Sequence, residues 1–189
     1  MKLKYLKTFE GYKLEPHRNY DEREILILKK TIELLKNNKN IYDIIDIKTL
    51  PIKSLYNLEM CIKLDISGNK TLKSLNNLIY IQDDLFANFS NIKDLGELKL
   101  VEGVVYLDNT KHIKNLTKLK HISDDLSIVN SNIESLYPLK YCGNDIYAYD
   151  SKLKDIGDLN LSNFFGTLYL SKNHNIPKEL LKNINYKID

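Results

Sequence analysis

Residues 126–142 read Leu126-Ser-Ile128-Val-Asn-Ser131-Asn-Ile133-Glu-Ser-Leu136-Tyr-Pro-Leu139-Lys-Tyr-Cys142. Apolar residues alternate with polar ones at the start of this segment, which predicts a short β-strand. Further on, an apolar residue stands at every third position. That spacing predicts a helical or 3₁₀-like segment that returns the chain to the start of the next strand.

The same pattern recurs along most of the chain. Its copies begin at Ile45, Leu64, Leu85, Val105, Leu126, Ile146 and Leu168, so the successive steps are 19, 21, 20, 21, 20 and 22 residues. One copy cannot bury its apolar face alone, so the copies must stack and share a core. We therefore expect a strand-dominated repeat solenoid of about seven coils, whose strands form one parallel sheet.

A small polar residue stands five positions after the first apolar residue in the six copies from Leu64 onward. This position holds Asn69, Ser90, Thr110, Ser131, Ser151 and Asn173. The chain leaves the sheet here, where backbone groups would otherwise be buried without partners. We expect these side chains to hydrogen-bond that backbone, which is a structural role.

The segment Leu64-Asp-Ile66-Ser-Gly-Asn69 resembles the L-x-L-x-x-N core of leucine-rich repeats. The segment Ile122-Ser-Asp-Asp-Leu126 departs from it, because three residues separate its apolar positions where the usual repeat has two. This spacing resembles receptor L-domains and related bacterial surface repeats. The resemblance covers about residues 41–184 and implies a right-handed, single-sheet α/β solenoid. It also implies binding of proteins or other ligands through the stacked sheet.

The two ends of the repeat region, residues 1–40 and 185–189, are expected to form an N-terminal cap and a C-terminal tail. Residues 21–38 predict a helix with Asp21 as N-cap and Glu24 at the third position. Its apolar face is formed by Ile25, Leu28, Ile32 and Leu35. A helix covering the first coil is the expected role, and a helix presented to a partner is the alternative. Residues 1–20 are expected to add a strand and loop to this cap.

The C-terminal stretch from Pro177 to Asp189 predicts a short helix followed by the tail. An open solenoid end exposes an unpaired strand edge. A homodimer formed through the solenoid ends is therefore a candidate assembly.

Cys61 and Cys142 occupy the same position of the repeat, and Ile81, Val101 and Ile122 fill that position in the coils between them. Four strand spacings place the two cysteines about 19 Å apart. A disulfide needs Cα atoms within about 7 Å. We expect two reduced, buried cysteines.

No catalytic or cofactor motif stands out in the chain. It has no Gly-rich phosphate loop, no C-x-x-C pair and no histidines at metal-ligand spacing. Its aspartates do not follow the glycine-rich pattern of calcium-binding repeats. We expect no enzyme activity, no cofactor and no metal. If the chain were an enzyme, a groove lined by Asp and Tyr residues that acts on a carbohydrate would be the alternative most consistent with the sequence.

The outward face of the predicted strands combines aromatic and acidic residues. It holds Phe86, Tyr106, Tyr147, Tyr149 and Tyr169 together with Asp65, Asp84, Asp108, Asp125 and Asp145. Exposed tyrosines and acids are typical of a binding surface. The structural alternative is aromatic stacking across strands that only stabilises the sheet. The acidic character favours a protein partner with a basic surface, or mimicry of nucleic-acid charge.

A row of lysines offers an alternative function. Lys53, Lys73, Lys93, Lys114 and Lys154 follow the turn of their coils, and Glu134 interrupts the row. Stacked lysines could bind phosphates of a nucleic acid, for which Lys73, Lys93, Lys114 and Lys154 are the candidate site. The competing interpretation is a charged row that keeps the back of the solenoid solvated.

Composition limits the class of protein. The chain has 189 residues, of which 43% are hydrophobic and 28% charged, and its net charge is +3. That charge is too small to indicate a polyanionic partner, and the only arginines, Arg18 and Arg23, lie near the N-terminus. Lysines interrupt the N-terminal segment too often for a signal peptide, and no segment is apolar enough to span a membrane. We expect a cytoplasmic protein without a membrane partner.

These observations together predict a non-enzymatic solenoid that acts by stoichiometric binding to another protein through its sheet face. The small size and the composition rich in Lys, Asn and Ile are compatible with an inhibitor of a host protein, encoded by a phage or mobile element and acting in the host-cell cytoplasm.

Overall fold

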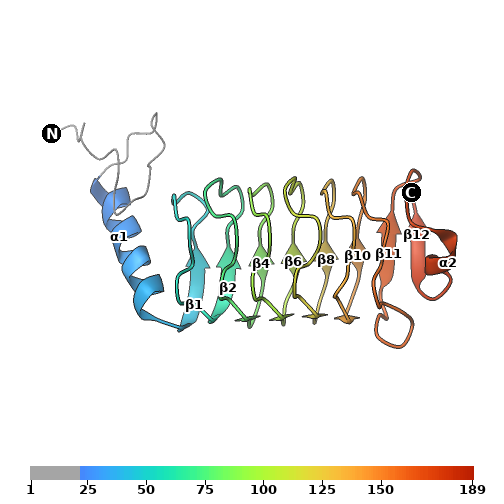
Figure 1. Cartoon of the computed structure of the whole chain (residues 1–189), viewed down its shortest axis with the longest axis horizontal. Coiled ribbons are helices and arrows are strands. Elements are labelled where there is room, and N and C mark those ends of the chain that lie inside the picture. Colours follow the sequence, from blue (N-terminus) through green and yellow to red (C-terminus); the bar gives the residue numbers. More distant parts are fainter. Residues whose placement is uncertain (1–21) are drawn as a thin grey trace.

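The computed structural model describes residues 22–189 (Figure 1). Helix α1 (Glu22–Asn37) stands at one end, a stack of parallel strands forms the body, and the short helix α2 (Lys178–Leu181) lies at the other end. The chain is a single-sheet β-solenoid with coils of about 20 residues, as the repeat predicts. Residues 1–21 lie outside this description, and with them the expected N-terminal strand and the Asp21 N-cap.

The strands form two parallel ladders that meet in β2 (Met60–Asp65). One ladder contains β1 (Asn40–Asp46), β2, β4 (Leu85–Phe86), β6 (Val105–Tyr106), β8 (Leu126–Ser127), β10 (Ile146–Tyr147), β11 (Thr167–Leu170) and β12 (Asn185–Ile188). The other contains β2, β3 (Tyr80–Ile81), β5 (Leu100–Val101), β7 (His121–Ile122) and β9 (Tyr141–Cys142).

The break between the two ladders explains the unusual spacing of the repeat. In β2, one continuous strand contributes to both ladders. In the later coils the strand is divided: Ile122 ends β7, Leu126 begins β8, and the three residues between them form a bend. Compared with β2, each later coil has one more residue at this point. The additional residue interrupts the strand, so backbone N–H groups at the bend lack a carbonyl of the neighbouring strand and need another acceptor.

The core consists of apolar columns that run along the stack. The column that starts the main ladder holds Ile45, Leu64, Leu85, Val105, Leu126, Ile146 and Leu168, and all of these side chains are buried. The return segments, in which every third residue is apolar, supply further buried columns, for example Leu55, Leu75, Leu95, Leu116, Leu136 and Ile156. The inward positions expected from the alternation are thus confirmed.

The return segments are not helical, contrary to expectation. The helices of residues 22–189 are α1 and α2 alone. Each return combines extended residues, with isolated bridges such as Ser74 to Asp94 and Ser135 to Asp155, and a tight turn, such as the one in which the Leu78 N–H donates to the Leu75 carbonyl at 3.1 Å. Their backbone bonds to the neighbouring coil, as when the Lys93 N–H donates to the Lys73 carbonyl at 2.7 Å. The apolar spacing of three residues thus marks a tight turn and not a 3₁₀ helix, because the residue after the first leucine has a positive φ, 53° at Asn76 and 58° at Gly96.

Some, but not all, of the small polar residues that follow the strands form the predicted hydrogen bonds to backbone groups. Asn69 is buried and donates from Nδ2 to the carbonyls of Ile47 at 2.7 Å and Leu50 at 3.0 Å, while its Oδ1 accepts the Leu72 N–H. Thr110 donates to the Leu107 carbonyl at 2.6 Å. Ser90, however, is buried with a hydroxyl that has no partner among the described residues. Asn173 is exposed, because the stack ends beside it.

The two ends differ in how they are covered. On α1, Leu28, Ile32 and Leu35 are buried in the same apolar cluster as the coils, and α1 stands beside β1 in Figure 1. At the other end residues 185–189, expected as a tail, add the strand β12 to β11, and the Asp189 N–H donates to the Leu170 carbonyl. Neither α1 nor α2, the helices of the described part, is long and apolar enough to cross a membrane.

Candidate functional site

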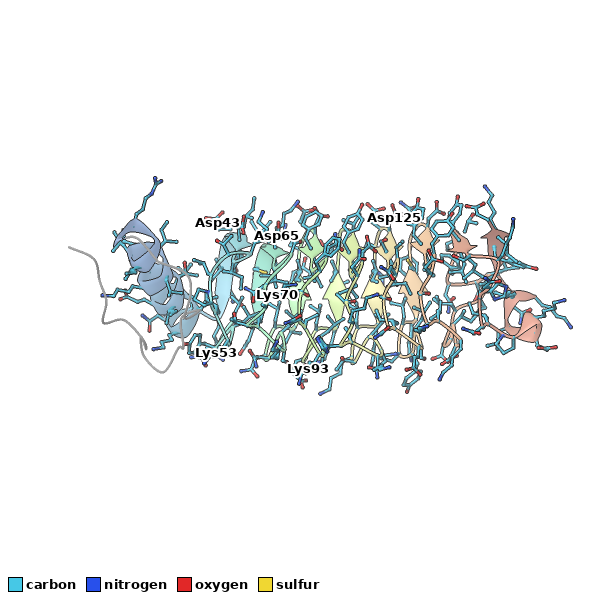
Figure 2. The ribbon with its side chains drawn as sticks, turned by 90° about the horizontal axis from the view of Figure 1, so that it is seen from above. Asp43, Lys53, Asp65, Lys70, Lys93 and Asp125 are labelled. Carbon is cyan, nitrogen blue, oxygen red and sulfur yellow. The ribbon has the colours of Figure 1, made fainter. Side chains whose placement is uncertain are left out.

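The outward positions of the main ladder form one straight row across the sheet. Strand register aligns Asp46, Asp65, Phe86, Tyr106, Ser127, Tyr147, Tyr169 and Lys187 in that order. Figure 2 shows Asp65 and Asp125 on one side of the stack, with Lys53 and Lys93 on the opposite side. The structure therefore brings the predicted aromatic and acidic residues together on one face.

The aromatic side chains of this row stack in two pairs. The rings of Phe86 and Tyr106 lie 5.4 Å apart at an interplanar angle of 8°, and those of Tyr147 and Tyr169 lie 5.1 Å apart at 10°. Tyr149 leans on Tyr169 with a centroid distance of 6.2 Å. Such cross-strand pairs stabilise the sheet, so the structural alternative accounts for part of the aromatic content.

Three of the aspartates replace backbone acceptors at the bend between the ladders. Asp84 accepts the Val104 N–H at 3.1 Å, Asp125 accepts the Asp145 N–H at 2.9 Å, and Asp145 accepts the Thr167 N–H at 2.8 Å. Each uses Oδ1 and leaves Oδ2 outside that bond. Sequence reasoning missed this role, although an Asp directly before the first apolar residue of a coil is a recurring signal.

Lysines partly compensate the acids in the N-terminal half of the face. Lys48 Nζ lies 3.0 Å from the Asp46 carboxylate and 3.1 Å from that of Asp65. Burial raises the pKa of Asp65, but hydrogen bonds from Ser67 and Lys48 outweigh it, so the pKa lies below its usual value. Lys63 pairs with Asp84 and lies 4.5 Å from the centre of the Phe86 ring.

The C-terminal half of the face carries acid without such pairing. Among residues 22–189, no salt bridge reaches Asp108, Asp124, Asp125 or Asp145. Burial, followed by the charges of Asp124 and Asp145, raises the pKa of Asp125. Burial, followed by the charges of Asp125 and Asp145, also raises the pKa of Tyr147. This part of the surface therefore holds an uncompensated negative potential beside aromatic rings.

The far edge of the face is closed by β12. The Tyr149 hydroxyl donates to Asp189 at 2.7 Å, and burial together with this bond raises the pKa of Tyr149 to about 12. Lys187 Nζ lies 5.4 Å from the centre of the Tyr169 ring. The unpaired acids thus lie between the half whose acids lysines partly compensate and this edge.

The lysine row of the alternative function is interrupted electrostatically. Lys114 and Lys154 both pair with Glu134, at 2.7 Å and 2.6 Å. Hydrogen bonds and charge from these two lysines lower the pKa of Glu134 to about 2. Lys73 and Lys93 form no salt bridge among the described residues, and burial followed by repulsion from Lys93 and Lys70 lowers the pKa of Lys73. Two of the four candidate lysines therefore share one carboxylate, which cancels half of their combined charge.

Both cysteines are free and buried, as predicted, and they occupy the ends of the row Cys61, Ile81, Val101, Ile122, Cys142. Burial raises the pKa of each thiol to about 12, which keeps both protonated and unreactive at neutral pH.

An open groove of about 480 Å³, which the sequence did not suggest, runs along the turns on another side of the coils. Its lining includes Ser54, Ser74, Asn76, Asp94 and Lys118 and contains no histidine or cysteine. Within residues 22–189, no group of three or more His, Cys, Asp or Glu side chains could hold a metal ion.

Comparison of the chain with protein-family models, with curated proteins and with solved structures gives no match. The likeness to leucine-rich repeats therefore depends on the repeat pattern itself.

Proposed function

We propose that this chain is a non-enzymatic protein-binding solenoid that holds a partner with a basic surface against the C-terminal half of its outward sheet face. We call this half the acidic–aromatic surface. It comprises Tyr106, Asp108, Asp125, Asp145, Tyr147, Tyr149 and Tyr169. The observation that carries the proposal is the contrast in ion pairing along the face, since Lys48 and Lys63 pair with acids of the first coils and no lysine of the described residues pairs with Asp108, Asp125 or Asp145.

Unpaired carboxylates close to one another repel and lose hydration, as the raised pKa of Asp125 reflects. A basic partner would relieve this repulsion and would be attracted over a distance by the same charges. Half-buried tyrosines beside the acids supply rigid contact area, as is common at the centre of protein interfaces. Phe86, Asp65 and Asp84 were expected in the binding site as well, and we assign them to its margin because Lys48 and Lys63 already engage them.

The leucine-rich-repeat character, of the L-domain type, belongs to this proposal too. It is supported by the L-x-L-x-x-N segments and by the parallel ladder that they form. The inhibitor function, the origin from a phage or mobile element and the cytoplasmic location stay predictions.

The test is affinity capture from host lysate with nuclease, at about 300 mM salt, which suppresses simple phosphate binding. Four baits are compared: the wild-type chain, the double variant Tyr106→Ala with Tyr147→Ala, Asp125→Asn, and the control Asp158→Asn. Asp158 is exposed and lies in the turn of a return segment, outside the strands that carry the acidic–aromatic surface. We expect one protein to be retained near stoichiometrically by the wild type and the control, and to be lost or strongly reduced with the other two baits.

Equal retention by all four baits would overturn the assignment to this surface. Loss of every partner under nuclease, with RNA or DNA recovered in the untreated control, would favour the lysine row instead.

A further inference from the structure

The aromatic row is interrupted at one step. Ser127 stands between Tyr106 and Tyr147, and register aligns all three across β6, β8 and β10. Tyr106 stacks with Phe86 on its far side, and Tyr147 stacks with Tyr169 on its far side. Among residues 22–189, no ring pairs with either tyrosine on the side turned toward Ser127. We call this position the ladder gap.

The ladder gap has the width of one planar group. Rings one strand apart stack at 5.4 Å and 5.1 Å on this face. Tyr106 and Tyr147 are two strands apart, which corresponds to about 10 Å. A flat group midway would lie about 5 Å from each ring, within the range of aromatic stacking and of cation–π contacts.

Carboxylates surround the ladder gap. Asp125 precedes Ser127 by two residues on the same outward face, and Asp108 and Asp145 flank it on the neighbouring strands. The Ser127 hydroxyl donates to Asp108 Oδ1 at 2.6 Å. Ser127 is 5% exposed, so neighbouring side chains cover it in the unliganded chain, and an inserted group has to displace them. Within the described residues, the hydrogen bonds of Asp108 and Asp125 all use Oδ1 and leave Oδ2 open.

A guanidinium group fits all of these features. It is planar and stacks on aromatic faces, and it carries a charge at every physiological pH. Its fork of N–H donors matches carboxylates. An ammonium group lacks the flat faces, and a partner's aromatic ring would leave the carboxylates without a donor. No lysine of this chain forms an ion pair with the carboxylates beside the ladder gap in the described part.

We propose that the partner inserts an arginine side chain into the ladder gap, where the guanidinium completes the row between Tyr106 and Tyr147 and donates to Asp108 and Asp125. This inference rests on the proposed function and names the chemical group that the surface selects. Arginine would be the anchor of the partner, and the remaining contacts would exclude water around it.

The experiment titrates the full chain with three short peptides that differ in one residue: acetyl-Gly-Arg-Gly-amide, the lysine analogue and the uncharged citrulline analogue. The chain has 13 tyrosines and no tryptophan. NMR of ring-labelled tyrosine, assigned by single Tyr→Phe variants, therefore reports on each ring separately. We expect saturable shifts of Tyr106 and Tyr147 with the arginine peptide, with a dissociation constant on the order of 1 mM. The lysine and citrulline peptides should bind at least about fivefold more weakly.

Two variants at one position test the ladder gap itself. Ser127→Tyr fills it with the residue that already stands on both neighbouring strands, so the fold should tolerate it, and we expect the arginine shifts to disappear. Ser127→Ala removes only the hydroxyl and should retain binding within about threefold. Asp125→Asn keeps the backbone acceptor, removes the charge and should weaken binding by about three- to tenfold.

Equal shifts with arginine and lysine, or full binding by Ser127→Tyr, would overturn the inference. These outcomes are separable from failure of the proposed function. A partner that is still captured through the acidic–aromatic surface while the arginine peptide shows no selectivity would overturn only the ladder-gap assignment.

Discussion

The Asp125 carboxylate accepts the backbone N–H of Asp145 at 2.9 Å, so one acid holds the next acid of the same column in place on the adjacent strand. The bond satisfies a donor that the bend between the ladders leaves without a carbonyl. It also fixes two like charges next to each other, and the pKa of Asp125 lies above its usual value as a result of burial and this crowding. The hydrogen bond that stabilises the bend therefore also places the two negative charges side by side.

Asp125→Asn should therefore stabilise the unliganded chain at pH 7. The amide oxygen can still accept the Asp145 N–H, while the repulsion disappears, and a gain of a few tenths of a kcal/mol is expected for this partly exposed site. The pKa of Asp125 is raised on folding, so the wild type gains stability as pH falls through that pKa. Urea unfolding at pH 7 and at pH 4 measures this, and the advantage of the variant should shrink at the lower pH. A variant less stable than wild type at pH 7 would contradict the expectation.

Asn69→Ala should be strongly destabilising, because Asn69 bonds two carbonyls and two backbone N–H groups of its neighbours. Leaving several buried groups without partners is expected to cost about 3 kcal/mol in the free energy of unfolding. Asn173→Ala is the matched control, since Asn173 has the same repeat position but is exposed. It should change stability by less than about 0.5 kcal/mol. Similar losses for both variants in denaturant titrations would argue against a role for burial.

Ser90 and Thr110 occupy equivalent positions and should respond oppositely to removal of the hydroxyl. The Ser90 hydroxyl has no partner among the described residues, so Ser90→Ala should be neutral or stabilising by up to about 1 kcal/mol. The Thr110 hydroxyl donates to Leu107, and Thr110→Val keeps the volume but loses that bond, at an expected cost of about 1 kcal/mol. Thermal unfolding of the two variants beside wild type checks the sign of each change. A clear loss of stability in Ser90→Ala would show that its hydroxyl is bonded.

Glu134→Gln should change how the free energy of unfolding depends on pH in the acid range. Hydrogen bonds and charge from Lys114 and Lys154 lower the pKa of Glu134 to about 2. The stabilisation is present above the unfolded value and is lost as pH falls toward the folded one. The difference in stability between wild type and variant should thus be larger at pH 6 than at pH 2, and smaller at high salt. A difference that does not change with pH would exclude this ion-pair contribution.

Glu134→Lys, in turn, tests the alternative function. It would make the lysine row continuous from Lys73 to Lys154, and nucleic-acid affinity should rise at low salt if that row were a binding track. Electrophoretic mobility shift at two salt concentrations checks this. We expect the wild type to bind weakly, because Glu134 interrupts the row and cancels one of the two charges of Lys114 and Lys154.

Particular residues show how far the sequence could lead. The alternation of Leu64 and Ile66 and the identical repeat position of Cys61 and Cys142 predicted the core columns and the distance between the thiols, because burial of a stacked repeat depends only on period. The three-residue beat of the return segments could not be resolved in the same way. Its apolar spacing suits a 3₁₀ helix as well as the tight turn that is present, and the positive φ of residues such as Asn76, which spacing alone does not specify, distinguishes the two.

The sequence by itself determined the solenoid, its parallel sheet and the collection of aromatic and acidic residues on one face, since register carries each outward residue onto the next strand. Only the tertiary structure decided which of those acids keep an uncompensated charge. Asp84 and Asp125 occupy the same repeat position, but Lys63 pairs with Asp84, whereas Asp125 meets Asp124 and Asp145. The reason is physical: the pairing of charges depends on the separation of side-chain tips across coils, which a repeat period does not specify.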